Sequence, residues 1–531
     1  MQFANLNLTL RIPEESTMDI IFLGNTCNNS YNIAKSLRAA GHACTLFYDP
    51  TFHPQTFPET EDPEIKYDWP SWIHKISLLD KTPSPYEGPS PSFLEKLRNA
   101  DLIHCEGYYV LWAKKTGKPY FWFPYGSDSA YYLRWSSWLD LPPWTAIPLK
   151  FMDATLHCSG INFSQGVITQ AYFKKFLDKY YSGYISKNFF PVDTHKFSPQ
   201  KHNLDQLLHK HKIEKKTHGL IIFNPTRIMF TKKSDYNYGS DILLKILKEL
   251  RHNNIDFTLI QIIRNGPDDN EFKKIACQYD LEENIIYINW IRRSDLPAWY
   301  SSVDVVVNEF KFGGLGSISL EAMSCGKPLV SNMLPSNLPC STDSEFTWEP
   351  PFYPSVPQEK AIQSLTEAAL FPEKKMQRGF LSRQWVLDHA SYEVAVQKFI
   401  HTYEICLNWG HIQTDTHSFA DVTDDLFKKI MHAFYKIDKN RRAAFIAKML
   451  DKYPASEKIL GLFCIQLQQD HKFERLYSVL VQLKSINLNI MYTPSLLTKF
   501  FLIPYMIKRR LKNIFPIYLI FSILKRIVKI K

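Results

Sequence analysis

The stretch that decides the fold is residues 303–331, VDVVVNEFKFGGLGSISLEAMSCGKPLVS. A valine run typical of a buried strand is followed by a glycine-rich turn, a segment with helical spacing of apolar residues from 317, and a second apolar run from 328. A strand, a turn, a helix and another strand within about thirty residues form the repeating unit of a parallel sheet. We therefore predict an α/β fold for this region.

The same alternation continues on both sides of this stretch. In the second half of the chain it predicts strands at 219–224, 257–263 and 285–290 and helices at 241–253 and 270–279. In the first half it predicts strands at 18–24, 43–48, 101–105, 120–123 and 154–158, with helices at 28–40 and before Gly117. Residues 49–92, rich in Pro, aromatic and acidic residues, are predicted to be an irregular insertion with a few short elements.

Two such sets in series predict two Rossmann-like domains facing a ligand-binding cleft at their strand ends. An all-α C-terminal extension is predicted to follow, with helices at 424–437, 440–453, 456–469 and 472–486. Its second hairpin repeats the first after about 32 residues, which fits a tetratricopeptide-type pair, and a plain helical bundle fits as well. Whether it is a tetratricopeptide-type pair or a plain bundle, this helical extension could bind a protein partner. The predicted regions are an N-terminal domain (18–190), a linker (191–214), a C-terminal domain (215–383), a crossover helix (384–406), the helical extension (415–490) and a basic tail (491–531).

Composition narrows the class of protein. The 531 residues are 45% hydrophobic and 22% charged, as in globular proteins. The nine cysteines are scattered without metal-ligand spacing, so we expect reduced thiols, a cytoplasmic location and no metal site. Glu14 and Glu15 near the start do not fit a secretory signal, so none is expected.

The net charge of +10 is concentrated at one end. Residues 499–531 carry nine Lys or Arg and no Asp or Glu, and the rest of the chain is nearly neutral, which argues against a nucleic-acid binder. The longest uncharged run of this tail, 513–524, is shorter than the ~20 residues that span a bilayer. We predict that it lies on an anionic membrane surface, and the alternative is a helix that packs on the helical extension.

The glycine-rich turn is a candidate binding site for a diphosphate. Gly313, Gly314 and Gly316 allow close approach of a ligand, and the helix beginning near Ser317 offers backbone N–H groups to a diphosphate. One turn into that helix, Glu321 is placed to accept hydrogen bonds from hydroxyls such as those of a ribose. The alternative is a tight turn beside an ordinary surface glutamate.

This stretch resembles the signature of the family-4 retaining glycosyltransferases of GT-B fold. Further motifs resemble the family's landmarks in the same order, and together they span about residues 18–406. They are Pro124-Tyr125-Gly126-Ser127-Asp128, Pro191-Val192-Asp193-Thr194 with Phe197, Pro225-Thr226-Arg227, Lys232-Lys233, Tyr238-Gly239-Ser240-Asp241, Arg264-Asn265-Gly266-Pro267 and Ile288-Asn289-Trp290-Ile291.

The resemblance implies that the C-terminal domain binds a nucleotide-sugar donor, without a metal or other cofactor, and that the N-terminal domain binds the acceptor. Arg227 and Lys232 or Lys233 would hold the diphosphate as charge grows on it, and Glu321 would bind the ribose. The remaining implied binding residues are Gly24 and Asn25, opposite and near the donor or acceptor, Tyr125 and Gly126 of the first-domain landmark, Trp290 and Ile291 beside the base, and Gly316 and Ser317 on the phosphates.

Two positions depart from the family pattern. Gly313 stands where the family has its first glutamate, and Glu309, four residues earlier, is the candidate to replace it. Tyr125 stands where the family commonly has a histidine. Either change would retune the donor or weaken activity. We therefore predict a sugar transferase acting on a glycan or a lipid-linked acceptor, with a catalytically inactive sugar-nucleotide sensor or scaffold as the alternative. A nucleotide-sugar epimerase would need acid/base residues that the sequence does not identify.

Overall fold

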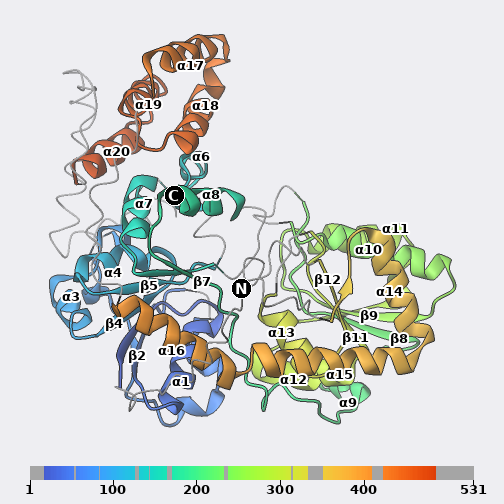
Figure 1. The fold of residues 1–531 in the computed structure, drawn as a ribbon. Helices are drawn as coiled ribbons and strands as arrows, with labels where there is room; N and C mark the ends of the chain where they lie inside the picture. Colours follow the sequence, from blue (N-terminus) through green and yellow to red (C-terminus); the bar gives the residue numbers. More distant parts are fainter. Residues whose placement is uncertain are drawn as a thin grey trace, which may run out of the picture.

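The computed structural model describes residues 17–52, 56–82, 84–125, 131–142, 144–163, 170–231, 237–311, 315–332, 351–408 and 422–485. Two parallel sheets, each covered by helices on both faces, lie side by side, and a group of helices stands above the first (Figure 1). The predicted α/β fold with two Rossmann-like domains and an all-α extension is confirmed.

The first sheet has seven strands in the order β3-β2-β1-β4-β5-β6-β7. They are β1 (Asp19–Leu23), β2 (Ala43–Tyr48), β3 (Ile73–Lys75), β4 (Leu102–Cys105), β5 (Tyr120–Trp122), β6 (Gly160–Asn162) and β7 (Tyr184–Ser186), and every neighbouring pair is parallel. The helices α1 (Asn29–Ala39) and α16 (Tyr392–Asn408) pack on one face, and α3 (Pro91–Leu97), α4 (Val110–Thr116), α7 (Pro148–Leu156) and α8 (Gln170–Tyr180) pack on the other. The strand order reverses between β1 and β4, and ligands bind at such a reversal.

One detail of the first domain differs from the predictions, and another agrees with them. Residues 154–158 are not a strand, because Pro148 starts helix α7 and Leu149, Met152 and Leu156 recur at helical spacing on its buried side. The strand of this region is β6, a little later in the chain. The insertion 49–92 contains short elements, as predicted: the edge strand β3 and the short helices α2 (Pro58–Glu61), η3 (Pro63–Lys66), η4 (Leu78–Asp80) and η5 (Pro85–Glu87).

The second sheet has six parallel strands in the order β10-β9-β8-β11-β12-β13. They are β8 (Leu220–Asn224), β9 (Phe257–Ile262), β10 (Ile285–Ile288), β11 (Val305–Val307), β12 (Leu329–Ser331) and β13 (Tyr353–Pro354). One face is covered by α10 (Ser240–His252), α11 (Asp269–Gln278) and α14 (Gln358–Leu370), and the other by α12 (Leu296–Ser302), α13 (Ser317–Ser324) and α15 (Pro372–His389) (Figure 1). The linker between the domains carries α9 (Leu204–Lys210), which packs on α12.

The predicted crossover helix 384–406 is two helices, which is a correction. Helix α15 ends at His389 and α16 begins at Tyr392, and Ala390 between them has a φ of −136°. The linker causes the break, because the backbone N–H of Val192 donates to Ala390 O (2.8 Å) and Tyr392 N–H donates to Val192 O (3.1 Å). Helix α15 thus packs on α13 in the second domain, and α16 packs on the first sheet.

Helix α16 is built into the first domain. The hydroxyl of Tyr403 lies 2.7 Å from Nδ1 of the fully buried His104 on β4. A Cβ on Gly160 would lie 2.5 Å from Sγ of Cys406, so only glycine lets β6 approach this helix so closely. The first domain is therefore completed by residues more than two hundred positions after its last strand.

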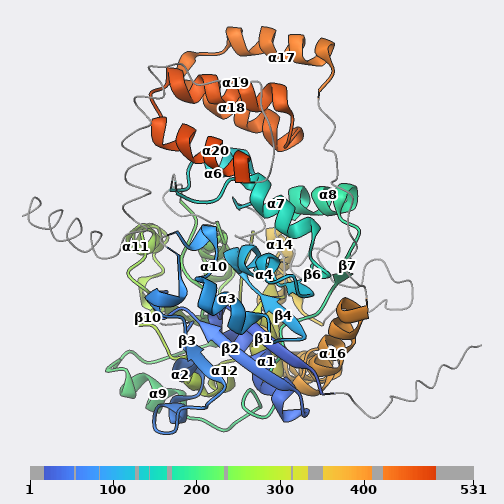
Figure 2. The same ribbon diagram turned by 90° about the vertical axis from the view of Figure 1, so that its left-hand side faces the viewer.

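The extension contains α17 (Asp424–Lys436), α18 (Lys439–Lys452), α19 (Glu457–Gln469) and α20 (Phe473–Ser485), which confirms the four predicted helices. It stands over helices α6 (Trp135–Trp138), α7 and α8 of the first domain (Figure 2). The indole N–H of Trp135 donates to Pro454 O (3.2 Å), and Arg475 donates to Trp138 O (2.9 Å) and Leu141 O (2.5 Å).

Within the part of the chain that the structure describes, no helix combines the length and the apolar character needed to cross a membrane. The basic tail predicted at 491–531 lies outside the described residues. Its contact with a membrane surface stays a prediction.

Candidate functional site at the facing sheet ends

Two arginines follow neighbouring strands of the second sheet. Arg227, three residues after β8, is exposed and donates a hydrogen bond to the Tyr238 hydroxyl (3.2 Å). Arg264, two residues after β9, is partly buried, and burial followed by the like charge of Arg227 lowers its pKa to about 10. Two guanidinium groups close enough to repel each other at the carboxyl ends of parallel strands form an arrangement suited to an anionic ligand.

A ladder of buried polar side chains fixes the backbone around these arginines. The Thr226 hydroxyl donates to Oδ1 of Asn308 (2.6 Å), and the amide of Asn308 donates to the Ser319 hydroxyl (2.8 Å). Asn224 at the end of β8 donates to Gln261 of β9 (2.8 Å). The turns after β8 and β11 and the start of helix α13 are therefore held as one unit.

Glu309, the candidate to replace the family's first glutamate, lies close enough to Arg227 to feel its charge. It follows β11, its side chain is partly accessible, and its carbonyl accepts the N–H of Asn332 (2.9 Å). Burial raises the pKa of its carboxyl to about 7, although the charge of Arg227 opposes the shift. A carboxyl that is partly protonated near neutral pH can both donate to and accept from a sugar hydroxyl.

Helix α13 begins after Gly316, in an open position. A Cβ on Gly316 would have no described atom within 4 Å, so a ligand can approach the backbone there. Glu321 in the same helix is only 1% exposed, so it is not the surface glutamate of the alternative interpretation. Burial raises the pKa of this carboxyl against the opposing charge of Arg293.

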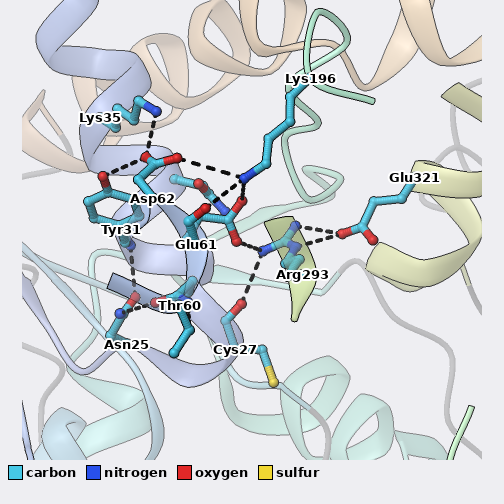
Figure 3. A network of polar contacts seen from close by, with 12 residues as sticks. Asn25, Cys27, Tyr31, Lys35, Thr60, Glu61, Asp62, Lys196, Arg293 and Glu321 are labelled. Atoms are coloured by element: carbon cyan, nitrogen blue, oxygen red, sulfur yellow. Dashed lines mark hydrogen bonds and ion pairs between the residues drawn. The ribbon is translucent and has the colours of Figure 1, made fainter. Parts of the chain in front are cut away.

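A charged network joins this helix to the first domain (Figure 3). Arg293 of η8 (Arg293–Asp295) lies 2.6 Å from Oε1 of Glu321 and 3.0 Å from Oε2 of Glu61 in α2. Its guanidinium also donates to the carbonyl of Cys27 (3.3 Å). Lys196 of the linker lies 2.6 Å from Glu61. The two domains and the linker therefore meet around Glu61 and Arg293.

The facing edge of the first domain is a tightly bonded loop around Glu106. Glu106 follows β4, is 2% exposed, and accepts hydrogen bonds from the Thr26 N–H (2.6 Å), the Ser30 hydroxyl and the Tyr125 hydroxyl (3.2 Å). Burial raises its pKa to about 7, against the lowering effect of these hydrogen bonds. The predicted residue Tyr125 is thus part of this loop.

The loop itself has an unusual backbone. Gly24 has a φ of +97°, and Cys27 and Asn28 have φ values of 53° and 60°, which non-glycine residues adopt only when the surroundings hold them. Asn25 holds the turn, because its side chain accepts the Tyr31 N–H (2.9 Å) and donates to Asn28 Oδ1 (2.7 Å). This backbone places the carbonyl of Cys27 where it accepts a hydrogen bond from Arg293 (Figure 3).

The predicted base-flanking residues lie beside a cavity of about 560 Å³. The indole of Trp290 is 38% exposed, and Ile291 is buried. Lys196, His211 and Trp299 are among the other residues that line the cavity, so the linker forms part of its wall.

Lys232, Lys233, Gly126 and Gly313 lie outside the described residues. Sequence reasoning missed Glu106, Arg293, Glu61 and Lys196, and it quoted Arg264 without a role. Glu106 could have been found, because it directly follows the apolar run 102–105 at a strand end. The partnership of Glu61 with Arg293 has no local signal, since it joins positions from different domains.

The two facing sheets and the arginines at the strand ends of the second sheet are typical of a two-domain protein of GT-B fold. Residues 211–339 match the family of glycosyl transferases group 1. A glycosyltransferase from Rickettsia africae has a similar structure, with a TM-score of 0.51 and 14% identity over 74% of this chain and 99% of that chain. The structure of Anabaena Alr3699/HepE in complex with UDP and glucose is also similar. Its TM-score is 0.52, with 13% identity over 73% of this chain and 99% of that chain.

Two curated relatives match shorter stretches. A 41.2 kDa protein of the cps region of Klebsiella pneumoniae is 27% identical over 109 residues, which is 20% of this chain and 28% of that protein. The GDP-mannose-dependent alpha-(1-6)-phosphatidylinositol monomannoside mannosyltransferase of Mycolicibacterium smegmatis is 30% identical over 100 residues, 18% of this chain and 26% of that enzyme. The chain thus spans about a quarter of the length of these relatives. The two similar structures confirm the predicted GT-B fold, and the family match of residues 211–339 supports the predicted glycosyltransferase.

Proposed function

We propose that this protein transfers a sugar from a nucleotide diphosphate donor to a hydroxyl of a glycan or lipid-linked acceptor. The observation that carries the proposal is the pair Arg227 and Arg264 at the strand ends, beside the open start of helix α13. As the bond between the sugar and the phosphate oxygen breaks, negative charge grows on the diphosphate. Fixed guanidinium groups and helix N–H groups stabilise that charge.

In this proposal the donor occupies the second domain. Glu321 accepts hydrogen bonds from the ribose, Glu309 contacts the sugar, and the indole of Trp290 and Ile291 flank the base. Lys232 or Lys233 adds a further cation at the diphosphate, so the reaction proceeds without a metal, and with retention as in the family that the sequence resembles. The UDP and glucose named with the Anabaena structure and the mannosyltransferase activity named for the Mycolicibacterium relative support a nucleotide-sugar donor.

The acceptor is proposed to lie against the first domain, near Gly24, Tyr125 and the loop 24–28. The Mycolicibacterium relative is named for a phosphatidylinositol monomannoside, which is consistent with a lipid-linked acceptor for this chain. We further propose that the basic residues of 499–531 keep the protein at an anionic membrane surface in the cytoplasm.

The test is a screen of UDP-, GDP- and ADP-sugars for binding and slow hydrolysis by the wild type, Glu321→Ala and Glu283→Ala. Glu283 is the control because its side chain is 94% exposed. We expect one donor class to be hydrolysed by the wild type and the control, and hydrolysis to be lost in Glu321→Ala. Absence of binding to every sugar nucleotide by the folded wild type would refute the proposal.

A further inference from the structure

Glu321, the residue proposed to bind the donor ribose, is already engaged within the protein. Its Oε1 accepts from Arg293 Nε (2.8 Å), and a terminal nitrogen of the same guanidinium lies 2.6 Å from that oxygen. Its Oε2 accepts only a long hydrogen bond from the Tyr300 hydroxyl (3.4 Å) among the described residues. A carboxylate can accept about four hydrogen bonds, so Oε2 retains capacity for a ligand hydroxyl.

The guanidinium that holds Glu321 also reaches the first domain (Figure 3). The other terminal nitrogen of Arg293 lies 3.0 Å from Glu61 Oε2 and donates to the carbonyl of Cys27 (3.3 Å). Glu61 is fixed in turn by Lys196, whose ammonium donates to the Glu61 carboxylate (2.6 Å) and carbonyl (2.8 Å). One cation therefore bridges a donor-site carboxylate and two groups of the opposite domain.

The bridge is largely removed from solvent. The side chains of Glu321 and Glu61 are 2% and 3% exposed, and that of Arg293 is 18% exposed. Charges in such surroundings interact more strongly than at the surface, and removing one partner leaves the others uncompensated. Burial lowers the pKa of Arg293, but the carboxylates of Glu321 and Glu61 outweigh this effect and raise it, so the guanidinium stays charged.

We propose that Arg293 is a positioning residue that couples donor binding to the contact between the two domains. It holds Glu321 ionised and oriented toward the donor, and Glu61 holds Arg293 in place only when the domains are in contact. Because coupling is reciprocal, a bound donor also strengthens the contact through Glu61. This inference rests on the proposed function, and it gives the insertion 49–92 a role in donor affinity.

The first test measures the affinity of the full chain for UDP, GDP and ADP, using whichever the wild type binds. We expect Arg293→Gln to weaken binding by about tenfold and Glu61→Gln by about threefold, and the double variant to be no weaker than Arg293→Gln. The control is Lys375→Gln, which removes the Lys375–Asp304 ion pair (2.5 Å) within the second domain and should leave affinity unchanged. The side chain of Lys375 is 19% exposed, close to the 18% of Arg293. Glu61→Gln keeps the test valid if Arg293→Gln folds poorly.

A second readout separates positioning from simple structural support. The groups that face Glu321 are Arg293 of η8, Tyr300 of α12, Glu61 of α2, Lys196 of the linker and Cys325 after α13. Without Arg293, burial and Glu61 favour the protonated Glu321, a weaker acceptor for hydroxyls, so binding to Arg293→Gln should weaken as pH falls from 8 to 6. Glu309, whose pKa is raised to about 7, and the nucleotide phosphates titrate in both proteins, so binding to the wild type should weaken less than binding to Arg293→Gln over this range.

Unchanged affinity in Arg293→Gln, additive losses in the double variant, or losses that do not depend on pH would each overturn the inference while the proposed function stands. A folded wild type that binds no nucleotide would instead overturn the proposed function and the inference with it.

Discussion

The two sheet ends that meet in this molecule are built differently. The edge of the second domain presents Arg227 and Arg264, which repel each other, and the open start of helix α13. The edge of the first domain presents a loop whose polar groups are already bonded to Glu106 and Asn25. A concentration of positive charge is stabilised by an anion from outside, whereas a satisfied and rigid loop needs no ligand to order it. This difference supports the proposal that the charged part of a substrate binds to the second domain and its neutral part to the first.

Removing a cation from the edge of the second domain should have the largest effect. We expect Arg264→Ala to lower the rate of sugar-nucleotide hydrolysis by about a hundredfold, because the growing charge on the diphosphate loses a fixed donor. Steady-state hydrolysis of the donor found in the screen measures the effect. Arg251→Ala, at the exposed end of α10, is the control. Equal losses in the two variants would mean that general positive charge, and not a site, attracts the donor.

Replacing the buried acid of the first domain should have a smaller effect, on the pH dependence of stability. The pKa of Glu106 is raised from its ordinary value of 4.5 to about 7 by burial, so the folded state holds this proton more tightly than the unfolded state. The resulting stability is present below pH 4.5 and is lost as pH rises through 7. Between pH 5 and 8 we expect the free energy of unfolding to fall by on the order of 2 kcal/mol more in the wild type than in Glu106→Gln.

Denaturant titrations of both proteins at pH 5 and pH 8 measure this difference. Glu309, whose pKa is also raised to about 7, is present in both proteins and its contribution cancels. Identical pH dependence in the two proteins would show that Glu106 is ionised throughout this range and that the loop is less enclosed than the structure indicates.

A smaller effect is expected from crowding the loop of the first domain. A Cβ on Gly24 would lie 3.1 Å from the Tyr109 ring and 3.3 Å from Cβ of Glu106, at a φ of +97°. Gly41 has a similar φ of +99° with nothing within 4 Å, so Gly41→Ala carries the strain of the backbone alone. We expect Gly24→Ala to be less stable than Gly41→Ala by about 1 kcal/mol, seen as a lower melting temperature. A Gly24→Ala variant as stable as its control would show that the loop can shift, contrary to the rigid edge proposed above.

The sequence predicted what local patterns control. The periodicity of apolar residues located both sheets, and the run 303–331 located the turn, the helix and the strands around it. Prediction from the sequence failed where contacts between distant segments decide the structure. Residues 384–406 carry helical periodicity throughout, but Val192 of the linker takes the hydrogen bonds that would have continued the helix. The same reason hid the network of Glu61, Lys196 and Arg293, since nothing near any one of these residues points to its partners.

The return of helix α16 to the first sheet sets the timing of folding during synthesis. The surface around Phe121 and His104 is covered only when Tyr403 and its neighbours arrive. At roughly 5–20 residues per second, a ribosome needs on the order of 10–40 seconds to move from the last strand of the first domain to this helix. During that interval the aromatic face of β4 and β5 lacks its own cover. We therefore expect the growing chain to expose this apolar surface until helix α16 is made, and a chain terminated before residue 392 to keep it exposed.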